Sequence, residues 1–454
     1  SIYNSTQMQQ TLFTIPHELG GLPVFGWGWI LILWGIYGGV WLTRYYTTAK
    51  NPATAHPFIP IVAVAALIAF VLPFVEPTDT DGVATGLQIR GYGVMVLLGV
   101  LSGLGLLTIL ARRQNLPEDF AMSLMLYLFI PGLVGGRTWY VIQKWADFAA
   151  FDLQDNVNWN ITLPRIVKFT EGGLVVYGAL IGSMLGCLFY ISLRKLPKLA
   201  TLDIIVPALM VGMFFGRIGC FMNGCCYGGL CDATPLGVSF PAGSPPYMRH
   251  VDEGLMFDIP LQDKLGLIAN VAPRGEWQWV LTVTAVEPNG VAASAGVTVG
   301  QALLIKQKRD DRAWIEYIHR GLFSEDMFWL YTTENENRNL IGTITVGDMP
   351  PRSLNVYPAQ LLSSITGGII CIILLGFYQI RKCDGQVVAL FLSLYGLARF
   401  LLELVRTDEL GQLNTGLTIS QIGSIFALVI AGLLWWYTAR GKQGLAYPLH
   451  TDET

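Results

Sequence analysis

The segment "DIIVPALMVGMFFGRIGCFMNGCCYGG" covers residues 203–229 and joins an apolar run to a run rich in glycine and cysteine. The predicted span, about 202–219, is close to the roughly 20 residues that a membrane-spanning helix needs. The second part, from Gly216 onward, holds Arg217, Asn223, five glycines and three cysteines. An ionisable residue at the end of a membrane helix is costly and usually functional. We therefore expect a membrane protein with a polar site at the end of this helix.

The composition of the whole chain agrees with a membrane protein. Of its 454 residues, 52% are hydrophobic and only 13% are charged, whereas soluble domains carry about 25% charged residues. The formal net charge of −3 argues against nucleic acid as a partner.

Apolar segments long enough to cross a bilayer recur along the chain, so we predict an α-helical polytopic membrane protein with about nine transmembrane helices. The candidates are roughly 23–43, 58–75, 91–111, 119–142, 173–193, 202–219, 359–379, 386–405 and 419–439. Lysine and arginine are concentrated in alternate short loops, for example at Arg112, Arg194 and Arg381. The positive-inside rule then places the N-terminus outside and the C-terminus in the cytoplasm.

Residues 240–352 are not membrane-like and predict a small β-rich extracytoplasmic insertion. Within it, "VTAVEPNGVAASAGVTVGQALLIKQ" (283–307) reads as a strand, a turn, a helix start and, after Gly300, a second strand. This part resembles the carboxylate-binding loop of a PDZ domain, in which a peptide ligand adds to a sheet edge. The alternative is an insertion that only shields the site. The predicted divisions are 1–87 with two transmembrane helices, 88–239 as the first part of the core, 240–352, 353–443 with the last three helices, and a flexible tail at 444–454.

Unusual polar residues occur at one depth on one face of several predicted spans. Arg137, Arg217 and Arg399 all lie in apolar or glycine-rich surroundings, and converging guanidinium groups suit a phosphate. Each arginine alone can also be an interfacial anchor whose head reaches water. Arg399 and Glu403 are four residues apart on one helix face, so we expect them to pair.

Several motifs carry a family likeness, and they occur in the family's order. They are "IRGYGVMVLLG" (89–99), "GGRTWYV" (135–141), "EGGLVVYGALIG" (171–182), the opening segment, "YPAQL" (357–361), "LYGLARFLLELVR" (394–406) and "GLTISQIGS" (416–424). Together they resemble the prolipoprotein diacylglyceryl transferase family over about 88–439, apart from the insertion.

The resemblance implies a bacterial inner-membrane enzyme that needs no metal or organic cofactor. Its partners would be phosphatidylglycerol and the signal peptides of prolipoproteins. It would move a diacylglyceryl group from the lipid to the lipobox cysteine thiol and release glycerol phosphate. Arginines near the leaving phosphate would stabilise its charge, and a base would help to form the attacking thiolate.

The resemblance also implies roles for individual positions. The implied catalytic residues are Arg217, Arg399, Tyr92 and Tyr177. The implied substrate-binding residues are Arg137, Asn223, Glu403, Arg406, Gln360, Gly172 and Gly173. This chain departs from the family pattern at Tyr177, where a histidine is usual, and at Cys220 and Cys225, where the signature has asparagine and glutamate. Tyrosine has a reference pKa of about 10 and is a weaker base than histidine at neutral pH.

Four cysteines fall close together, at Cys220, Cys225, Cys226 and Cys231. Disulfides among them are allowed in an oxidising outer compartment, and free thiols are the alternative. The spacing is not that of paired CxxC zinc ligands and no histidine is close, so we expect no metal. Two other functions stay open: a non-catalytic membrane protein that binds lipid or signal peptide, and a thiol-redox protein using Cys225 and Cys226.

Overall fold

The computed structural model describes residues 11–48, 58–71, 86–149, 157–167, 175–231, 236–275, 278–307, 326–332, 340–406, 416–440 and 444–447. The chain divides into two compact units, residues 1–94 and 95–454, which we describe separately.

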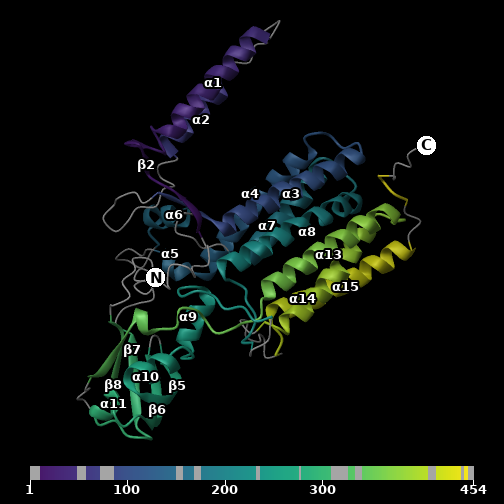
Figure 1. The fold of residues 1–454 in the computed structure, drawn as a ribbon. Helices are drawn as coiled ribbons and strands as arrows, with labels where there is room; N and C mark the ends of the chain where they lie inside the picture. Colours follow the sequence, from purple (N-terminus) through teal and green to yellow (C-terminus); the bar gives the residue numbers. More distant parts are fainter. Residues whose placement is uncertain are drawn as a thin grey trace. The chain divides into compact units, whose positions relative to one another are not determined.

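The first unit contains two small antiparallel strand pairs and two helices (Figure 1). Its elements are β1 (Thr11–Ile15), β2 (Glu18–Leu19), β3 (Leu22–Pro23), α1 (Trp29–Thr48), α2 (Phe58–Ala66), a π-helical turn (Leu67–Val71), β4 (Leu87–Arg90) and the start of α3. β1 pairs with β4, and β2 pairs with β3. Nε1 of Trp34 in α1 donates a hydrogen bond to the carbonyl of Ile61 in α2 at 3.0 Å.

Seven helices in the described residues are long and apolar enough to cross a membrane. They are α3 (Gly91–Arg113), α4 (Phe120–Gln143), α7 (Val176–Leu193), α8 (Lys198–Asn223), α13 (Ala359–Ile380), α14 (Gln386–Glu403) and α15 (Ile419–Arg440). They coincide with the last seven predicted spans and confirm a polytopic helical membrane protein.

The first two predicted spans, 23–43 and 58–75, are not among these seven helices. α1 begins six residues later than predicted and ends in a polar stretch that includes Arg44. The described part of the second predicted span is α2 with its π-helical turn, residues 58–71, and residues 72–75 lie outside the described residues.

Glycines allow α4 and α7 to pack backbone against backbone. A Cβ atom added to Gly135 would lie 2.4 Å from the carbonyl oxygen of Gly178, which is too close. A Cβ atom added to Gly182 would lie 2.1 Å from the carbonyl oxygen of Pro131. Such small-residue contacts are a common way for membrane helices to associate. The other helices pack as a second group in which α13 and α14 contact α8, and α15 contacts α14 (Figure 1).

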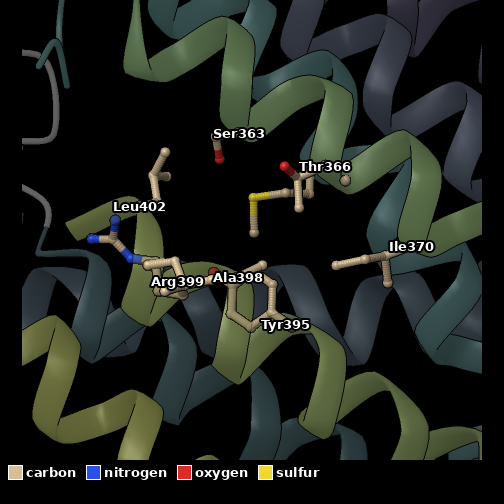
Figure 2. A pocket seen from close by; sticks show the side chains of 10 residues that line it. Ser363, Thr366, Ile370, Tyr395, Ala398, Arg399 and Leu402 are labelled. Atoms are coloured by element: carbon tan, nitrogen blue, oxygen red, sulfur yellow. The ribbon is translucent and has the colours of Figure 1, made fainter. Parts of the chain in front are cut away.

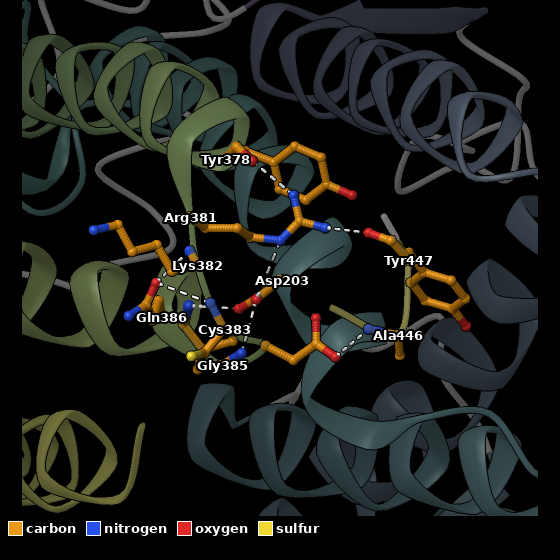
Figure 3. Close-up of polar contacts among 11 residues, drawn as sticks. Asp203, Tyr378, Arg381, Lys382, Cys383, Gly385, Gln386, Ala446 and Tyr447 are labelled. Carbon is orange, nitrogen blue, oxygen red and sulfur yellow. Dashed lines mark hydrogen bonds and ion pairs between the residues drawn. The ribbon is translucent and has the colours of Figure 1, made fainter. Parts of the chain in front are cut away.

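The basic loops between the helices are tied together at one end of the bundle. Arg194, after α7, forms an ion pair with Asp119, before α4, at 2.6 Å. Asp203 near the start of α8 accepts hydrogen bonds from the backbone N–H groups of Gly385 and Val388 at 2.8 and 2.9 Å, so it caps α14 (Figure 3). Arg381 donates to the carbonyl oxygens of Tyr378 and Tyr447 beside it. Asp203 precedes Arg217 by 14 residues, or about 21 Å of helix, so Arg217 lies toward the other end.

The β-rich insertion is confirmed as a five-stranded antiparallel sheet in the order β5-β6-β7-β8-β9. Its elements are α9 (Pro245–Asp252), α10 (Asp258–Leu265), β5 (Leu267–Gly275), β6 (Gln278–Val286), α11 (Val291–Ser294), β7 (Ala302–Gln307), β8 (Asp326–Thr332), β9 (Leu340–Thr345) and a 3-10 turn (Val346–Asp348). The predicted order of strand, turn, helix start and strand over 283–307 is present. Phe257, Trp279 and Phe328 form its aromatic core, with ring centroids 5.0 to 5.7 Å apart.

Candidate active site

α8 ends in a tight turn that is built from its glycines. Gly224 has φ +73° and caps the helix, a left-handed conformation that glycine adopts at little cost. The N–H of Cys225 then bonds back to the carbonyl of Cys220 at 3.1 Å. Cys226 also has a positive φ, of +60°, which is uncommon outside glycine. Arg217 lies almost two turns before this helix end and is partly exposed.

The cysteine turn is attached to the start of α13 and the end of α14. The side-chain amide of Gln360, which is fully buried, donates to the carbonyl of Cys225 at 2.8 Å. The N–H of Gly228 bonds to the carbonyl of Tyr357 at 2.8 Å, and the N–H of Gly229 bonds to that of Val405 at 3.1 Å. The structure therefore brings three distant segments to one junction. Among the predicted site residues, this junction gathers Arg217, Asn223, Gln360, Glu403 and Arg406.

Three thiols of the turn lie together beside two arginines. The Sγ atoms of Cys220, Cys225 and Cys226 are all within 4.8 Å of one another. Hydrogen bonds with the Cys220 and Cys225 thiols, followed by the charges of Arg217 and Arg406, lower the pKa of Cys226. The structure contains no disulfide among the seven cysteines, all of which lie in described residues. Pairing of these cysteines, and of Cys231, stays a prediction.

Arg399 is held on both sides near the end of α14. Its Nη1 lies 2.8 Å from Oε2 of Glu403, so the predicted pair is present, and its Nη2 donates to Oγ of Ser420 at 2.7 Å. Glu403 is fully buried at its side chain, whereas 13% of the Arg399 side chain is exposed. Ser420 had no predicted role. Its position two residues after Thr418, at the start of α15 in a conspicuous polar motif, was the signal that could have identified it.

Arg399 borders a largely apolar cavity of about 310 Å³ between α8, α13 and α14. Figure 2 shows Arg399 and Tyr395 of α14 on one side, and Ser363, Thr366 and Ile370 of α13 on the other. Met213 of α8 also lines it. Sequence reasoning missed Ser363 and Thr366, although two hydroxyls three residues apart in an apolar helix share one face.

A second apolar cavity, of about 320 Å³, lies on another side of α8, where α3 and α4 approach. Gly99 and Gly103 of α3, Met125 of α4, and Gly212 and Met213 of α8 are among its lining residues. Met213 borders both cavities. α8 therefore lies between two apolar spaces.

Arg137 and Tyr177 belong to the other helix pair, α4 and α7. Arg137 is only 5% exposed and donates to the carbonyls of Arg165 and Ile166 at 3.0 and 2.8 Å. These carbonyls end α6 (Trp159–Val167), which follows the short α5 (Trp145–Phe148), so Arg137 binds the last turn of a helix. Tyr177, 43% exposed, lies at a similar level, because the N–H of Val175 bonds to the carbonyl of Gly136.

Gly172 and Gly173 lie outside the described residues. Tyr92 is 44% exposed in the second position of α3 and belongs to the first unit.

The chain is similar to known proteins along most of its length. Residues 82–437 match the family model described as "Prolipoprotein diacylglyceryl transferase". A phosphatidylglycerol–prolipoprotein diacylglyceryl transferase of Rhodopirellula baltica is 32% identical over 94% of this chain and 88% of its own length. A protein of the same name from Bdellovibrio bacteriovorus is 27% identical over 76% of this chain and 88% of its own length. Another, from Halalkalibacterium halodurans, is 24% identical over 83% of this chain and 92% of its own length.

Proposed function

The chain belongs to the prolipoprotein diacylglyceryl transferase family and transfers a diacylglyceryl group from phosphatidylglycerol to prolipoproteins, and we propose that it does so where α8, α13 and α14 meet. The observation that carries this proposal is the position of Arg399 at the border of an apolar cavity. An amphiphilic lipid needs apolar walls for its acyl chains and a cation for its phosphate. The two cavities that share Met213 offer separate apolar spaces for two chains.

The arginines of the junction would act on the leaving group. Displacement at the sn-3 carbon of the lipid's glycerol leaves an anionic glycerol phosphate, and charge grows on its oxygen in the transition state. Guanidinium groups placed in advance around a growing charge lower the barrier because they need no reorganisation. Arg399 is immobilised by Glu403 and Ser420, so it is preorganised in this sense. Arg217 and Arg406 would serve the same anion from the cysteine turn.

The other predicted site residues remain part of the proposal. Gln360 and Asn223 would hold the turn and contact substrate, and Arg137 would bind from the α4–α7 pair. Tyr92 and Tyr177 would supply hydroxyl groups to the reaction, on the strength of their match to the family.

The chain is a multi-pass membrane protein, and we infer the orientation predicted from its loops. The basic loops around Arg112, Arg194 and Arg381 share the end of the bundle at which Asp203 caps α14. By the positive-inside rule this end would face the cytoplasm of a bacterial inner membrane. Arg217 and the insertion would then face outward, where a peptide could pair with an edge strand of the sheet in the manner of PDZ domains.

Alanine substitution tests the location of the site. Arg217→Ala and Arg399→Ala should each reduce transfer at least 100-fold, the usual effect of removing a group that stabilises transition-state charge. The assay follows the mass of a model prolipoprotein and the release of glycerol phosphate in membranes. Arg194→Ala is the matched control, because Arg194 is an exposed arginine in a surface ion pair. Normal transfer by Arg217→Ala and Arg399→Ala in properly inserted protein would move the site elsewhere.

A further inference from the structure

The three thiols of the α8 turn form a preorganised cluster. Cys220 comes from the helix, and Cys225 and Cys226 follow the glycine cap. Adjacent residues in an extended chain point to opposite sides, so two neighbouring thiols seldom face one partner. Here the positive φ of Cys226 turns the chain, and all three Sγ atoms lie within 4.8 Å of one another. A non-glycine residue held in this region of φ is costly and often marks a functional site.

The turn is also fixed from outside. Gln360 donates to the carbonyl of Cys225 at 2.8 Å. Downstream, Gly228 and Gly229 are bonded to the segments that begin α13 and end α14. The positions of the thiols therefore do not depend on a disulfide. A single disulfide among three sulfur atoms would moreover leave the third thiol without a role.

We propose that Cys220, Cys225 and Cys226 bind a zinc ion with one open coordination position, at which the cysteine thiol of the prolipoprotein binds and loses its proton. This inference rests on the proposed function. Thiolates are preferred ligands of zinc. Tetrahedral zinc with Zn–S bonds of ~2.3 Å places sulfur atoms about 3.8 Å apart, so side-chain rotations that close each separation by at most about 1 Å complete the site. Catalytic zinc sites commonly have three protein ligands and one open position.

The charges around the cluster support an anionic metal centre. Three thiolates and Zn²⁺ carry a net charge of −1, which becomes −2 when a substrate thiolate binds. Arg217 lies on α8 before the turn, and Arg406 follows Val405, whose carbonyl bonds to the N–H of Gly229, so both would offset this charge. The same two arginines face the phosphate in the proposed reaction, so thiol and leaving group would be activated at adjacent positions.

The chemical step balances without a redox partner. The substrate thiol binds the metal and releases its proton to water, because a coordinated thiol is deprotonated. A sulfur lone pair then forms a bond to the sn-3 carbon of phosphatidylglycerol. The carbon–oxygen bond to phosphate breaks, and its electron pair stays on glycerol phosphate. The product is a thioether, which is neutral and leaves the metal readily.

Metal binding and pH dependence test the inference on the purified full-length chain in lipid nanodiscs. Zinc content and Co²⁺ titration, read from the thiolate-to-cobalt charge-transfer band, should give about one metal per chain. Cys220→Ser, Cys225→Ser and Cys226→Ser should each weaken binding at least tenfold. Cys231→Ser is the matched control and should bind normally, because Cys231 is outside the cluster.

The activity of Cys226→Ser should show whether the metal activates the thiol. A thiol with a pKa of ~8.5 is only a few per cent ionised at pH 7, so we expect transfer to fall about 10- to 30-fold at that pH. The rate should then rise about tenfold per pH unit up to pH ~8.5, whereas the unsubstituted protein should change little. A merely structural loss would lower the rate equally at every pH and would overturn this role.

The outcomes separate this inference from the proposed function. Transfer that survives strong chelation and all three substitutions overturns the zinc site and leaves the function intact, and so does a disulfide among these cysteines in active protein. If the chain binds zinc through the three cysteines but transfers no lipid, the proposed function fails, and thiol activation by the metal fails with it.

Discussion

Replacing Glu403 by glutamine tests what the buried ion pair with Arg399 does. The two charged atoms lie 2.8 Å apart, and the side chains of Arg399 and Glu403 are 13% and 0% exposed. At this distance the Coulomb attraction is about 6 kcal/mol for an effective dielectric constant of ~20, and desolvation of both charges opposes it. Removing one partner leaves the other charge buried and typically costs about 3–5 kcal/mol. Glu403→Gln should therefore lower the melting temperature by on the order of 10 °C.

The double variant Arg399→Leu, Glu403→Leu separates stability from catalysis. Replacing a buried ion pair by apolar residues of similar size is often neutral or stabilising, so the melting temperature should return close to its original value. Transfer should remain at least 100-fold reduced, because the cation beside the cavity is gone. Tryptophan fluorescence during heating measures the first quantity, and prolipoprotein mass measures the second.

The exposed pair at the other end of the bundle provides the control. Arg194 and Asp119 are 48% and 54% exposed at their side chains, so the corresponding double leucine variant should change stability by only about 1 kcal/mol or less. Its transfer rate should be unchanged. A double variant at Arg399 and Glu403 that is both stable and fully active would refute a catalytic role for Arg399.

Two further predictions concern stability away from the site. Asp203→Ala removes two hydrogen bonds to the start of α14 and should lower the free energy of unfolding, measured by heating, by about 3–5 kcal/mol. The KM for the lipid should not change, because Asp203 is about 21 Å of helix from Arg217. A raised KM in folded protein would contradict this. Burial lowers the pKa of His250. The charge of Glu253 opposes this effect, and the charge of Arg249 adds to it. The unfolded chain therefore binds more protons below pH ~6.5, and stability should fall by up to about 1.4 kcal/mol per pH unit there. Hydrogen exchange in β6 should show this loss, and His250→Gln should reduce it.

The membrane core was predictable because its signals are strong and local. Long apolar runs gave the last seven helices, and the four-residue spacing of Arg399 and Glu403 gave their ion pair. The first two predicted spans stay predictions. α1 has the 20 residues that a membrane span needs but a polar C-terminal end, and the described part of the second span ends at residue 71.

The site was only partly predictable, because much of it depends on contacts between segments distant in sequence. Gln360 reaches the carbonyl of Cys225 across 135 residues, and no local pattern specifies such a bond. Arg137 was predicted to bind substrate, but the sequence did not indicate α6, whose last carbonyls it contacts. The cysteine spacing likewise did not indicate that the thiols of Cys220, Cys225 and Cys226 meet, because this depends on a left-handed turn at Cys226.

The proposed zinc site would give a physical reason for the departures from the family pattern that the resemblance implies. Alkylation of a thiol requires that the thiol lose its proton and that the departing phosphate be stabilised. The second requirement is met by arginine at any physiological pH. The first lacks a histidine base, because Tyr177 stands where the family resemblance implies a histidine. A zinc ion on Cys220, Cys225 and Cys226 would deprotonate the thiol by coordination, without a side-chain base. On this argument, the cysteines that interrupt the family signature compensate for the tyrosine, and both departures belong to one change in how the thiol is activated.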